Sequence, residues 1–572
     1  MKHYKALFQW LVFLGLVSAG CQSLEAKNDQ QTLRQIQSSS AKRRPNVVVI
    51  LTDDQDLHLN SLDYLPLIKK HLTDQGTFFK RHFCTTAICC PSRVSLWTGQ
   101  AAHNTNITDI LPPYGKLFNY HSVDNYDTPY PAGWTGSDFL LDPFTYAYLN
   151  PTFQRNKDPP VSYKGQYTTD ILASKALGFL DEAVAAGKPF FLGISPIAPH
   201  SNIDPALISD PDRDRAGKDF KATAPIPAER HAHMFPDVVV PRTDNFNPDE
   251  PSGANWIREQ PKQSEENVAY NDEYYRLRLR SLLAVDELVE SVMAKLAAYG
   301  ILSETYVFYT SDNGFHIGQH RLQPGKACGY EEDINVPLIV RGPGVAKGRV
   351  AGLVTTHQDL APTIMSLAGA PARADFDGVV IPLTEIDLLS SPKERNEHVT
   401  VEYWGQGASE GDWGYYGRNQ TFIFNNTYKA LRVISDEYNL YYSVWCNNEH
   451  ELYDMNEDPG QLNNLLHPDS PSGTLLGLPI GKVVSRLDTL LYVTKSCKGA
   501  VCARPWHALH PRGNVETLQH ALSQRFDGFY ESQQERVSFS RCEAGYLVDA
   551  EGPQFDQEGS VYWDKLAWSD WT

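Results

Sequence analysis

The sequence predicts an α/β protein in which helices cover both faces of a large mixed β-sheet and a smaller α+β domain follows. Three runs have the continuous apolar character of strands buried on both faces: residues 46–51, 189–195 and 306–310. Residues 271–296 have the spacing of an amphipathic helix with one side buried against the sheet. The length of 572 residues fits a large domain plus a smaller one.

Composition and charge exclude some partners. The chain is 41% hydrophobic and 21% charged, which is ordinary for a globular protein. The net charge of -18 argues against nucleic acid and against a strongly anionic polymer as a non-specific partner, because both would be repelled at long range.

The first 27 residues are predicted to be a secretory signal. Lys2 and Lys5 supply the positive start, and the apolar run that follows is too short and too early for a membrane span. We therefore expect a protein without a stable membrane span that is secreted to the cell wall or the extracellular space. Three Asn-x-Ser/Thr sequons fit a secreted glycoprotein: Asn106, Asn419 and Asn425.

The nine cysteines fit an oxidising compartment. Cys497 and Cys502 flank a short polar loop, and we predict a disulfide bond between them. The sequence leaves the other pairings open.

Oxygen-bearing side chains follow two of the predicted strands. Asp53 and Asp54 come after residues 46–51, and Asp312 and Asn313 come after residues 306–310. Open α/β sheets bind ligands at the carboxyl ends of their strands, and adjacent carboxylates repel each other unless a cation lies between them. Such hard donors suit calcium or magnesium, whereas an Asp-rich turn without metal is the alternative. We assign neither His316 nor His320 as a ligand, although both are close in sequence.

A second chemical feature is the stretch Cys89-Cys90-Pro91-Ser92-Arg93, which runs on to Thr98-Gly99. It is predicted to begin a helix, whose positive amino-terminal end suits an oxyanion. Arg93 lies one turn later and can face back toward Cys89. The alternative is a buried cysteine pair before an ordinary Pro-Ser helix start.

Read as Cys-x-Pro-Ser-Arg-x-x-x-x-Thr-Gly, this stretch resembles the signature of the type I, formylglycine-dependent sulfatases of the alkaline phosphatase-like superfamily. Further blocks follow in the order of that family: Gly115-Lys116, Ala198-Pro199-His200, Lys326 and residues 451–464. The resemblance covers roughly residues 45–465, and residues 495–572 resemble fungal-type secreted arylsulfatases.

The resemblance implies a sulfuric ester hydrolase that cleaves sulfate esters to an alcohol or phenol plus sulfate. A formylglycine-generating enzyme would convert Cys89 to formylglycine (3-oxoalanine), whose hydrate attacks sulfur. Arg93 would orient that group, two lysines would neutralise the sulfate, and His200 would protonate or stabilise the leaving group. The implied catalytic set is Cys89, Arg93, Lys116, His200 and Lys326. One divalent metal, Ca²⁺ in preference to Mg²⁺, would be held by Asp53, Asp54, Cys89, Asp312 and Asn313. The implied domains are residues 45–395 (catalytic) and 396–572 (carboxyl-terminal α+β).

One departure from the family pattern concerns the interval before Lys116, which follows Cys89 by only 27 positions. Relatives usually insert a further helix and strand there, and a crossover between parallel strands needs a dozen or more residues. Either the protein lacks one β-strand unit, or the chain is a shortened product, for example of a skipped exon, and we favour the second interpretation.

Two other functions stay open. One is a phosphodiesterase or phosphonate hydrolase of the same superfamily. The other is an inactive secreted glycoprotein that lacks the helix–strand unit before Lys116. The acidic surface favours small aryl or alkyl sulfates as substrates over sulfated polysaccharide. Nothing in the sequence indicates the oligomeric state.

Overall fold

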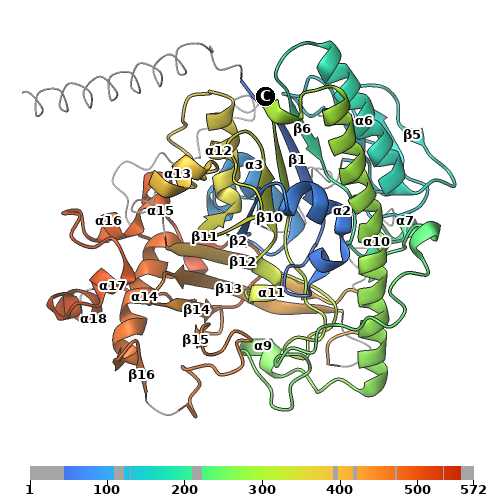
Figure 1. Ribbon diagram of the computed structural model, residues 1–572. Coiled ribbons are helices and arrows are strands. Elements are labelled where there is room, and N and C mark those ends of the chain that lie inside the picture. Colours follow the sequence, from blue (N-terminus) through green and yellow to red (C-terminus); the bar gives the residue numbers. More distant parts are fainter. Residues whose placement is uncertain are drawn as a thin grey trace, which may run out of the picture. The chain divides into compact units, whose positions relative to one another are not determined.

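Six strands form the larger sheet of the computed structural model (Figure 1). The structure describes residues 44–108, 121–128, 130–208, 222–390, 397–416, 421–470, 473–532 and 534–555. The six strands are β1 (Asn46–Thr52), β2 (Thr77–Phe83), β6 (Phe191–Ile194), β9 (Thr305–Ser311), β10 (Leu338–Arg341) and β11 (Arg349–Thr356). They lie in the order β11-β2-β10-β9-β1-β6, and β10 runs antiparallel to both of its neighbours. The sheet is therefore mixed, as predicted.

Helices cover both faces of this sheet. Helices α6 (Thr168–Ala185) and α10 (Glu265–Ala298) pack on the face that carries Val48 and Ile50, and α3 (Cys89–Thr98) and α12 (Leu360–Leu367) pack on the opposite face (Figure 1). Alternate residues of β1 thus enter two different cores, which is why the strand is continuously apolar from Val47 to Leu51. Helix α10 begins earlier than predicted because Ser264 caps its first turn by accepting a hydrogen bond from the backbone N–H of Asn267.

The remaining elements connect or flank these two layers. The short helices are α2 (Pro66–Ile68), α4 (Ala102–Thr105), α7 (Pro205–Ile208), α9 (Asn255–Arg258), α11 (Glu331–Ile334) and α13 (Glu385–Ser390). The small strands are β3 (Asp138–Leu140), β4 (Thr152–Arg155), β5 (Val161–Ser162), β7 (Asn202–Ile203) and β8 (Ala222–Thr223). Strands β3 and β4 pair with each other in antiparallel direction.

A second, antiparallel sheet follows in the carboxyl-terminal part. Its strands are β12 (His398–Ala408), β13 (Phe422–Ile434), β14 (Asn439–Trp445) and β15 (His450–Asp454), in that order. The elements after it are β16 (Thr474–Leu475), β17 (Leu478–Pro479), α14 (Ile480–Thr494), α15 (Ala500–Ala503), α16 (Pro505–Leu509), α17 (Leu518–Ala521) and α18 (Asp527–Ser532). Helix α14 packs on one face of this sheet, which gives the α+β character that the sequence predicts.

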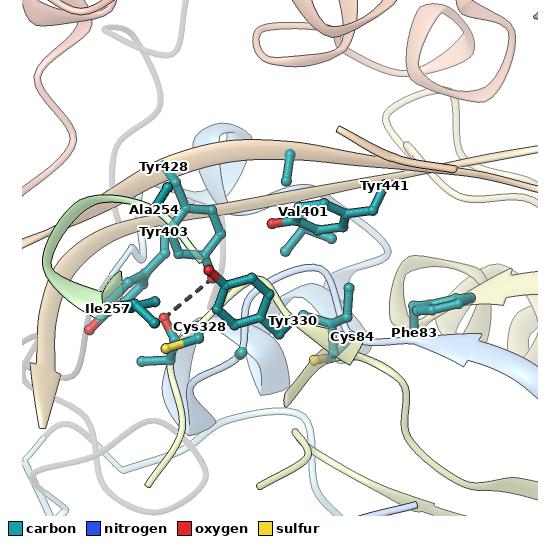
Figure 2. Packing of buried hydrophobic residues seen from close by; sticks show 14 of the residues in the cluster. Phe83, Cys84, Ala254, Ile257, Cys328, Tyr330, Val401, Tyr403, Tyr428 and Tyr441 are labelled. Carbon is teal, nitrogen blue, oxygen red and sulfur yellow. Dashed lines mark hydrogen bonds between the residues drawn. The ribbon is translucent and has the colours of Figure 1, made fainter. Parts of the chain in front are cut away.

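The other face of the second sheet packs against the larger sheet's end and its loops. Figure 2 shows Val401, Tyr403, Tyr428 and Tyr441 of the second sheet beside Phe83, Cys84, Cys328 and Tyr330. Tyr428 donates a hydrogen bond to the carbonyl of Ala327, 3.3 Å away. Because the segment 327–330 is enclosed in this shared core, the second sheet fixes the position of the chain next to Lys326.

Strand β6 differs from the sequence prediction. The run 189–195 was predicted to be buried on both faces, but β6 is the last strand of the sheet and Phe191 is 38% exposed. The apolar sequence of the strand is that of an interior strand, whereas its place is an edge.

The structure contains the predicted disulfide bond between Cys497 and Cys502 and a second one between Cys446 and Cys542. Cys84, Cys89, Cys90 and Cys328 are buried and take no part in these two disulfide bonds. Among the described residues, no helix is both long and apolar enough to cross a membrane.

A buried charge network joins helix α4 to the second sheet. Glu402 of β12 accepts hydrogen bonds from His103 of α4 (2.9 Å) and from Lys429 of β13 (2.8 Å), and all three side chains are buried. Burial alone would raise the pKa of Glu402, but His103 and Lys429 outweigh it and lower the pKa to about 2. This stabilisation is therefore present above the ordinary carboxyl pKa and is lost as the pH falls toward 2.

Glu402→Gln is expected to lower the free energy of unfolding at pH 6 by about 3–5 kcal/mol, because it removes the carboxylate that buried His103 and Lys429 share. Urea denaturation measures this loss. The control is Glu182→Gln, which removes an exposed ion pair with Arg155 and is expected to cost less than about 1 kcal/mol. An equal effect of the two substitutions would contradict the prediction.

Candidate active site

Cys89 is the first residue of α3, and its side chain lies among acidic groups. Ile88 precedes it in extended conformation and Gly99 ends the helix in left-handed conformation, with φ 71°. The N-cap residue Ile88 makes no side-chain hydrogen bond to the first turn, and the positive amino-terminal end of a helix favours an anion. Burial raises the pKa of the Cys89 thiol well above its ordinary value, so the encoded cysteine is a poor nucleophile.

Asp53 and Asp54 form the turn that follows β1, and both side chains are fully buried. Asp54 adopts a left-handed backbone with φ 65°, a conformation that non-glycine residues rarely take and that concentrates at functional sites. The backbone N–H of Asp54 donates to Oδ1 of Asp312 at 2.9 Å, which holds the turn against the end of β9.

Asp312 and Asn313 follow β9 and lie beside Asp53 and Asp54. Arg93 donates through Nε to Oδ2 of Asp312 at 2.8 Å, and its Nη2 lies 3.3 Å from Oδ1 of Asp53. The Asn313 amide donates through Nδ2 to Oδ1 of Asp54 at 2.8 Å. The structure thus brings together all four oxygen-bearing residues that the sequence predicted, with Arg93 between two of them.

The donor set fits a hard divalent cation. Ligand atoms of Asp53, Asp54, Cys89 and His200 all lie within 4.8 Å of one another. Oδ1 of Asn313 is buried and has no hydrogen-bond partner among the described residues. Burial raises the pKa of Asp312 to about 7 although Arg93 opposes the rise. An orphaned amide oxygen beside three buried carboxylates is the arrangement that an oxygen-preferring metal would satisfy.

Lys326 contacts the carboxylate of Asp54 directly. Its Nζ is 2.6 Å from both carboxylate oxygens of Asp54 and 3.3 Å from Oε1 of Glu410. Burial alone would lower the pKa of Lys326, but Asp54 and Glu410 outweigh it and raise the pKa well above its ordinary value. Lys326 is therefore a fixed positive charge in the site.

His200 follows β6 and completes the cluster. Its Nδ1 donates to the carbonyl of Ser201 at 2.7 Å, which leaves Nε2 directed at Asp54, 3.7 Å from Oδ2. Tyr146 stacks on the imidazole with the ring centroids 4.4 Å apart.

Several residues at the site were not predicted from the sequence. Glu410 lies more than 80 residues beyond Lys326 and contacts it from the end of β12. Asp333 accepts hydrogen bonds from the backbone N–H of Cys328 and from His316, and so closes the loop that carries Lys326. Arg278 of α10 donates to the carbonyls of Asp54 and Pro199. No local pattern marks these residues; only the fold brings them to the site.

Some predicted residues lie outside the described part of the chain, namely Lys116, Asn419 and residues 1–27. Asn106 and Asn425 are described, and both are exposed.

Comparison with known proteins decides the family. A family model described as Sulfatase matches residues 45–370, which include every described site residue except Glu410. The chain belongs to the sulfatase family. A second model, described as N-sulphoglucosamine sulphohydrolase, C-terminal, matches residues 318–473 of this sulfatase.

Individual relatives of the chain are also named as sulfatases. The chain is 38% identical to sulfatase ppz1 of Metarhizium majus (strain ARSEF 297), over 88% of this chain and 96% of the relative. It is 38% identical to an arylsulfatase of Volvox carteri, over 86% of this chain and 81% of the relative. Among solved structures, BT4656 in complex with its substrate D-glucosamine-2-N,6-O-disulfate has the same fold (TM-score 0.59, 21% identity, 74% of this chain and 94% of that chain).

The prediction of a sulfate-ester hydrolase of the sulfatase family is therefore confirmed. This sulfatase is an enzyme that hydrolyses sulfate esters, and its family uses a metal ion and a formylglycine residue.

Proposed function

We propose that this sulfatase cleaves small aryl or alkyl sulfate esters and that the residue converted to formylglycine is Cys89. The observation that supports this most directly is the position of Cys89, at the open amino-terminal end of α3 and beside the carboxylate cluster. Once converted by a formylglycine-generating enzyme, Cys89 would supply the hydroxyl nucleophile that the encoded thiol is too strongly protonated to provide.

The chain's own residues have distinct roles in this proposal. Arg93 is held by Asp312 and Asp53, so it orients the group at position 89 one helical turn before it. Lys326 neutralises negative charge on the sulfate, and Lys116 is proposed as the second cation. His200 presents Nε2 to the site and donates a proton to the leaving oxygen or stabilises its charge.

We further propose that Asp53, Asp54, Asp312 and Asn313 hold Ca²⁺, with position 89 as a further ligand. Ca²⁺ suits this set better than Mg²⁺, because it accepts six to eight oxygen ligands in flexible geometry. When bound, the ion supplies Lewis-acid polarisation of a sulfate oxygen. When no metal is bound, Lys326 lies close enough to Asp54 to neutralise the charge of its carboxylate.

Removal of the metal by EGTA is expected to abolish hydrolysis, and Ca²⁺ is expected to restore it better than Mg²⁺. Calcium at about 100 times its dissociation constant should also stabilise the fold by about 2.7 kcal/mol, because it binds only the folded chain. Thermal unfolding with and without Ca²⁺ measures this independently of activity. Asp53→Asn should remove the shift in melting temperature. If Ca²⁺ raised the melting temperature of that variant as much as that of the unaltered chain, the ion would bind at a different site.

The carboxyl-terminal part contributes to the site through Glu410. We propose that residues 45–395 carry the chemistry and that residues 396–572 close one side of the site, since Glu410 contacts both Lys326 and Ser201. We also propose that the protein is secreted after removal of residues 1–27 and is glycosylated at Asn106, Asn419 and Asn425. The two disulfide bonds support an oxidising compartment.

The test of the substrate class compares turnover of three substrates by one preparation: a small aryl sulfate, the matching aryl phosphate and a sulfated polysaccharide. We expect the highest kcat/KM for the aryl sulfate. A preference for the phosphate would indicate the phosphodiesterase-type chemistry, and a preference for the polymer would contradict the proposed substrate class.

A further inference from the structure

Two histidines that have no part in the proposed chemistry form a line of contacts that ends at Asp312. His82 lies near the carboxyl end of β2, and His357 comes directly after β11. Nε2 of His82 is 3.0 Å from Nδ1 of His357, and Nε2 of His357 is 3.0 Å from the carbonyl oxygen of Asp312. Both imidazoles are fully buried. The pair therefore connects two strands to a residue of the proposed metal site.

The sheet topology explains how this line arises. Strand β10 is antiparallel to both β2 and β9, so β2 and β9 run in the same direction and end at the same edge of the sheet. Strand β11 is parallel to β2 and places Thr355 beside His82, with Oγ1 of Thr355 2.8 Å from Nδ1 of His82. The carboxyl ends of strands are where open α/β sheets bind ligands. Both histidines thus lie at the functional edge of the sheet.

The protons between these groups have a definite arrangement. A carbonyl oxygen only accepts hydrogen bonds, so Nε2 of His357 carries a proton and donates it to the carbonyl of Asp312. Burial lowers the pKa of His357 to about 4, so the imidazole is neutral at neutral pH and its Nδ1 accepts. Nε2 of His82 is then the donor in the contact between the two rings. His82 therefore sets the tautomer and the orientation of His357.

The carbonyl of Asp312 receives a second hydrogen bond, which comes from α3. The hydroxyl of Ser92 donates to the same oxygen, so Ser92 and His357 use the two lone pairs of this carbonyl. The next residue, Arg93, donates through Nε to Oδ2 of Asp312 at 2.8 Å. Consecutive residues in the first turn of α3 are therefore attached to the main chain and to the side chain of one residue. Cys89 begins that same turn.

A buried pair of imidazoles is a costly way to fill a protein core. Polar groups lose free energy on burial unless they are hydrogen-bonded, whereas apolar side chains of similar size carry no such requirement. A chain of hydrogen bonds that must all be satisfied fixes a position more narrowly than apolar packing does. Such narrow positioning matters where catalytic groups have to be held within about 0.5 Å of their working geometry.

We propose that His82 and His357 are positioning residues that hold the carbonyl of Asp312 and thereby align the first turn of α3 with the metal ligands. His357 acts on Asp312 directly, and His82 acts by holding His357. Neither residue touches the substrate. The inference rests on the proposed metal site and nucleophile and adds to them the groups that keep the two in register.

The test compares two substitutions of His357 that differ in reach. Glutamine carries an amide N–H at about the distance of Nε2 and can still donate to Asp312, whereas the shorter asparagine amide ends near the position of Nδ1. His357→Asn is expected to lower kcat and the affinity for Ca²⁺ by about 10–100-fold, as is typical when a partner of a metal ligand is lost. His357→Gln should keep most of both. Equal losses in the two variants would overturn the proposal.

The two readouts separate this inference from the proposed function. Affinity for Ca²⁺ is measured without substrate, from the dependence of the melting temperature on the Ca²⁺ concentration. The value of kcat is measured with an aryl sulfate and corrected for the converted fraction of Cys89. If the unaltered chain hydrolysed no sulfate ester, the proposed function would fail, and the comparison of Ca²⁺ affinities would still decide whether His357 positions Asp312.

His398 of β12 provides a matched control. It is also buried, its Nε2 is 3.1 Å from the carbonyl oxygen of Cys502, and burial lowers its pKa to about 4. His398→Asn should lower the melting temperature but change neither kcat nor the affinity for Ca²⁺. If it lowered them as much as His357→Asn does, a general loss of stability would account for both variants and the proposal would be wrong.

Substitutions of His82 test the first contact of the line. His82→Leu leaves the donor of His357 in place but removes the group that orients it, so kcat should fall by about 10-fold, and His82→Gln should restore most of the loss. The double variant His82→Leu/His357→Asn should lose no more kcat than His357→Asn alone, because His82 acts through His357. Losses that add in the double variant, or a His82→Gln enzyme as impaired as His82→Leu, would contradict the proposal.

Discussion

Replacing Cys89 with alanine is expected to reduce sulfate-ester hydrolysis by at least about 10⁴-fold, because the substitution removes the side chain that we propose becomes the nucleophile. The fold should survive, since alanine fits the space that the thiol occupies and prolongs the helix. The measurement is kcat/KM for a chromogenic aryl sulfate, together with the circular dichroism spectrum of the purified variant.

The matched control for this prediction is Cys90→Ala. Cys90 is the neighbouring buried cysteine, but it occupies the variable position of the Cys-x-Pro-Ser-Arg pattern. This variant should keep most of the activity and the conversion of Cys89. Loss of activity in Cys90→Ala with full activity in Cys89→Ala would show that the reactive residue has been assigned to the wrong cysteine.

Lys326→Met is expected to lower kcat by about 10²–10³-fold, because it removes the buried cation that we propose neutralises the sulfate while the apolar volume is kept. The same change leaves Asp54 without its nearest positive group. The variant should therefore unfold at lower temperature in EGTA and recover part of the loss in Ca²⁺, which would neutralise the carboxylates in its place.

Lys347→Met provides the control, because Lys347 is exposed and its substitution should change neither kcat nor the melting temperature. A Lys326→Met enzyme with unchanged kcat and raised KM would contradict the proposed role. That result would show that Lys326 stabilises the bound substrate and the transition state of the reaction equally.

Much of the fold could be predicted from local patterns. The continuous apolar runs predicted β1 and β9, since strands buried on both faces lose the alternation of polar and apolar residues. The carboxylates at the ends of these strands had to meet because β1 and β9 are adjacent and parallel. The helix that starts at Cys89 was also predicted, and its first turn lies where the motif requires it.

Other features could not be predicted because they depend on contacts distant in sequence. Glu410 reaches Lys326 only because the second sheet packs against the end of the first. The disulfide bond between Cys446 and Cys542 spans 96 residues, and no local spacing indicates it. The exposure of β6 was predicted wrongly because an apolar run reports the composition of a strand and not the presence of both neighbours.

The central claim is that Cys89 becomes formylglycine and that the resulting enzyme hydrolyses sulfate esters. The most direct test is to co-express the chain with a formylglycine-generating enzyme, determine the mass of the peptide that contains Cys89, and assay the same sample with a chromogenic aryl sulfate. We predict that the mass changes from that of cysteine to that of formylglycine and that turnover rises in proportion to the converted fraction. Turnover by a fully unconverted sample would contradict the account.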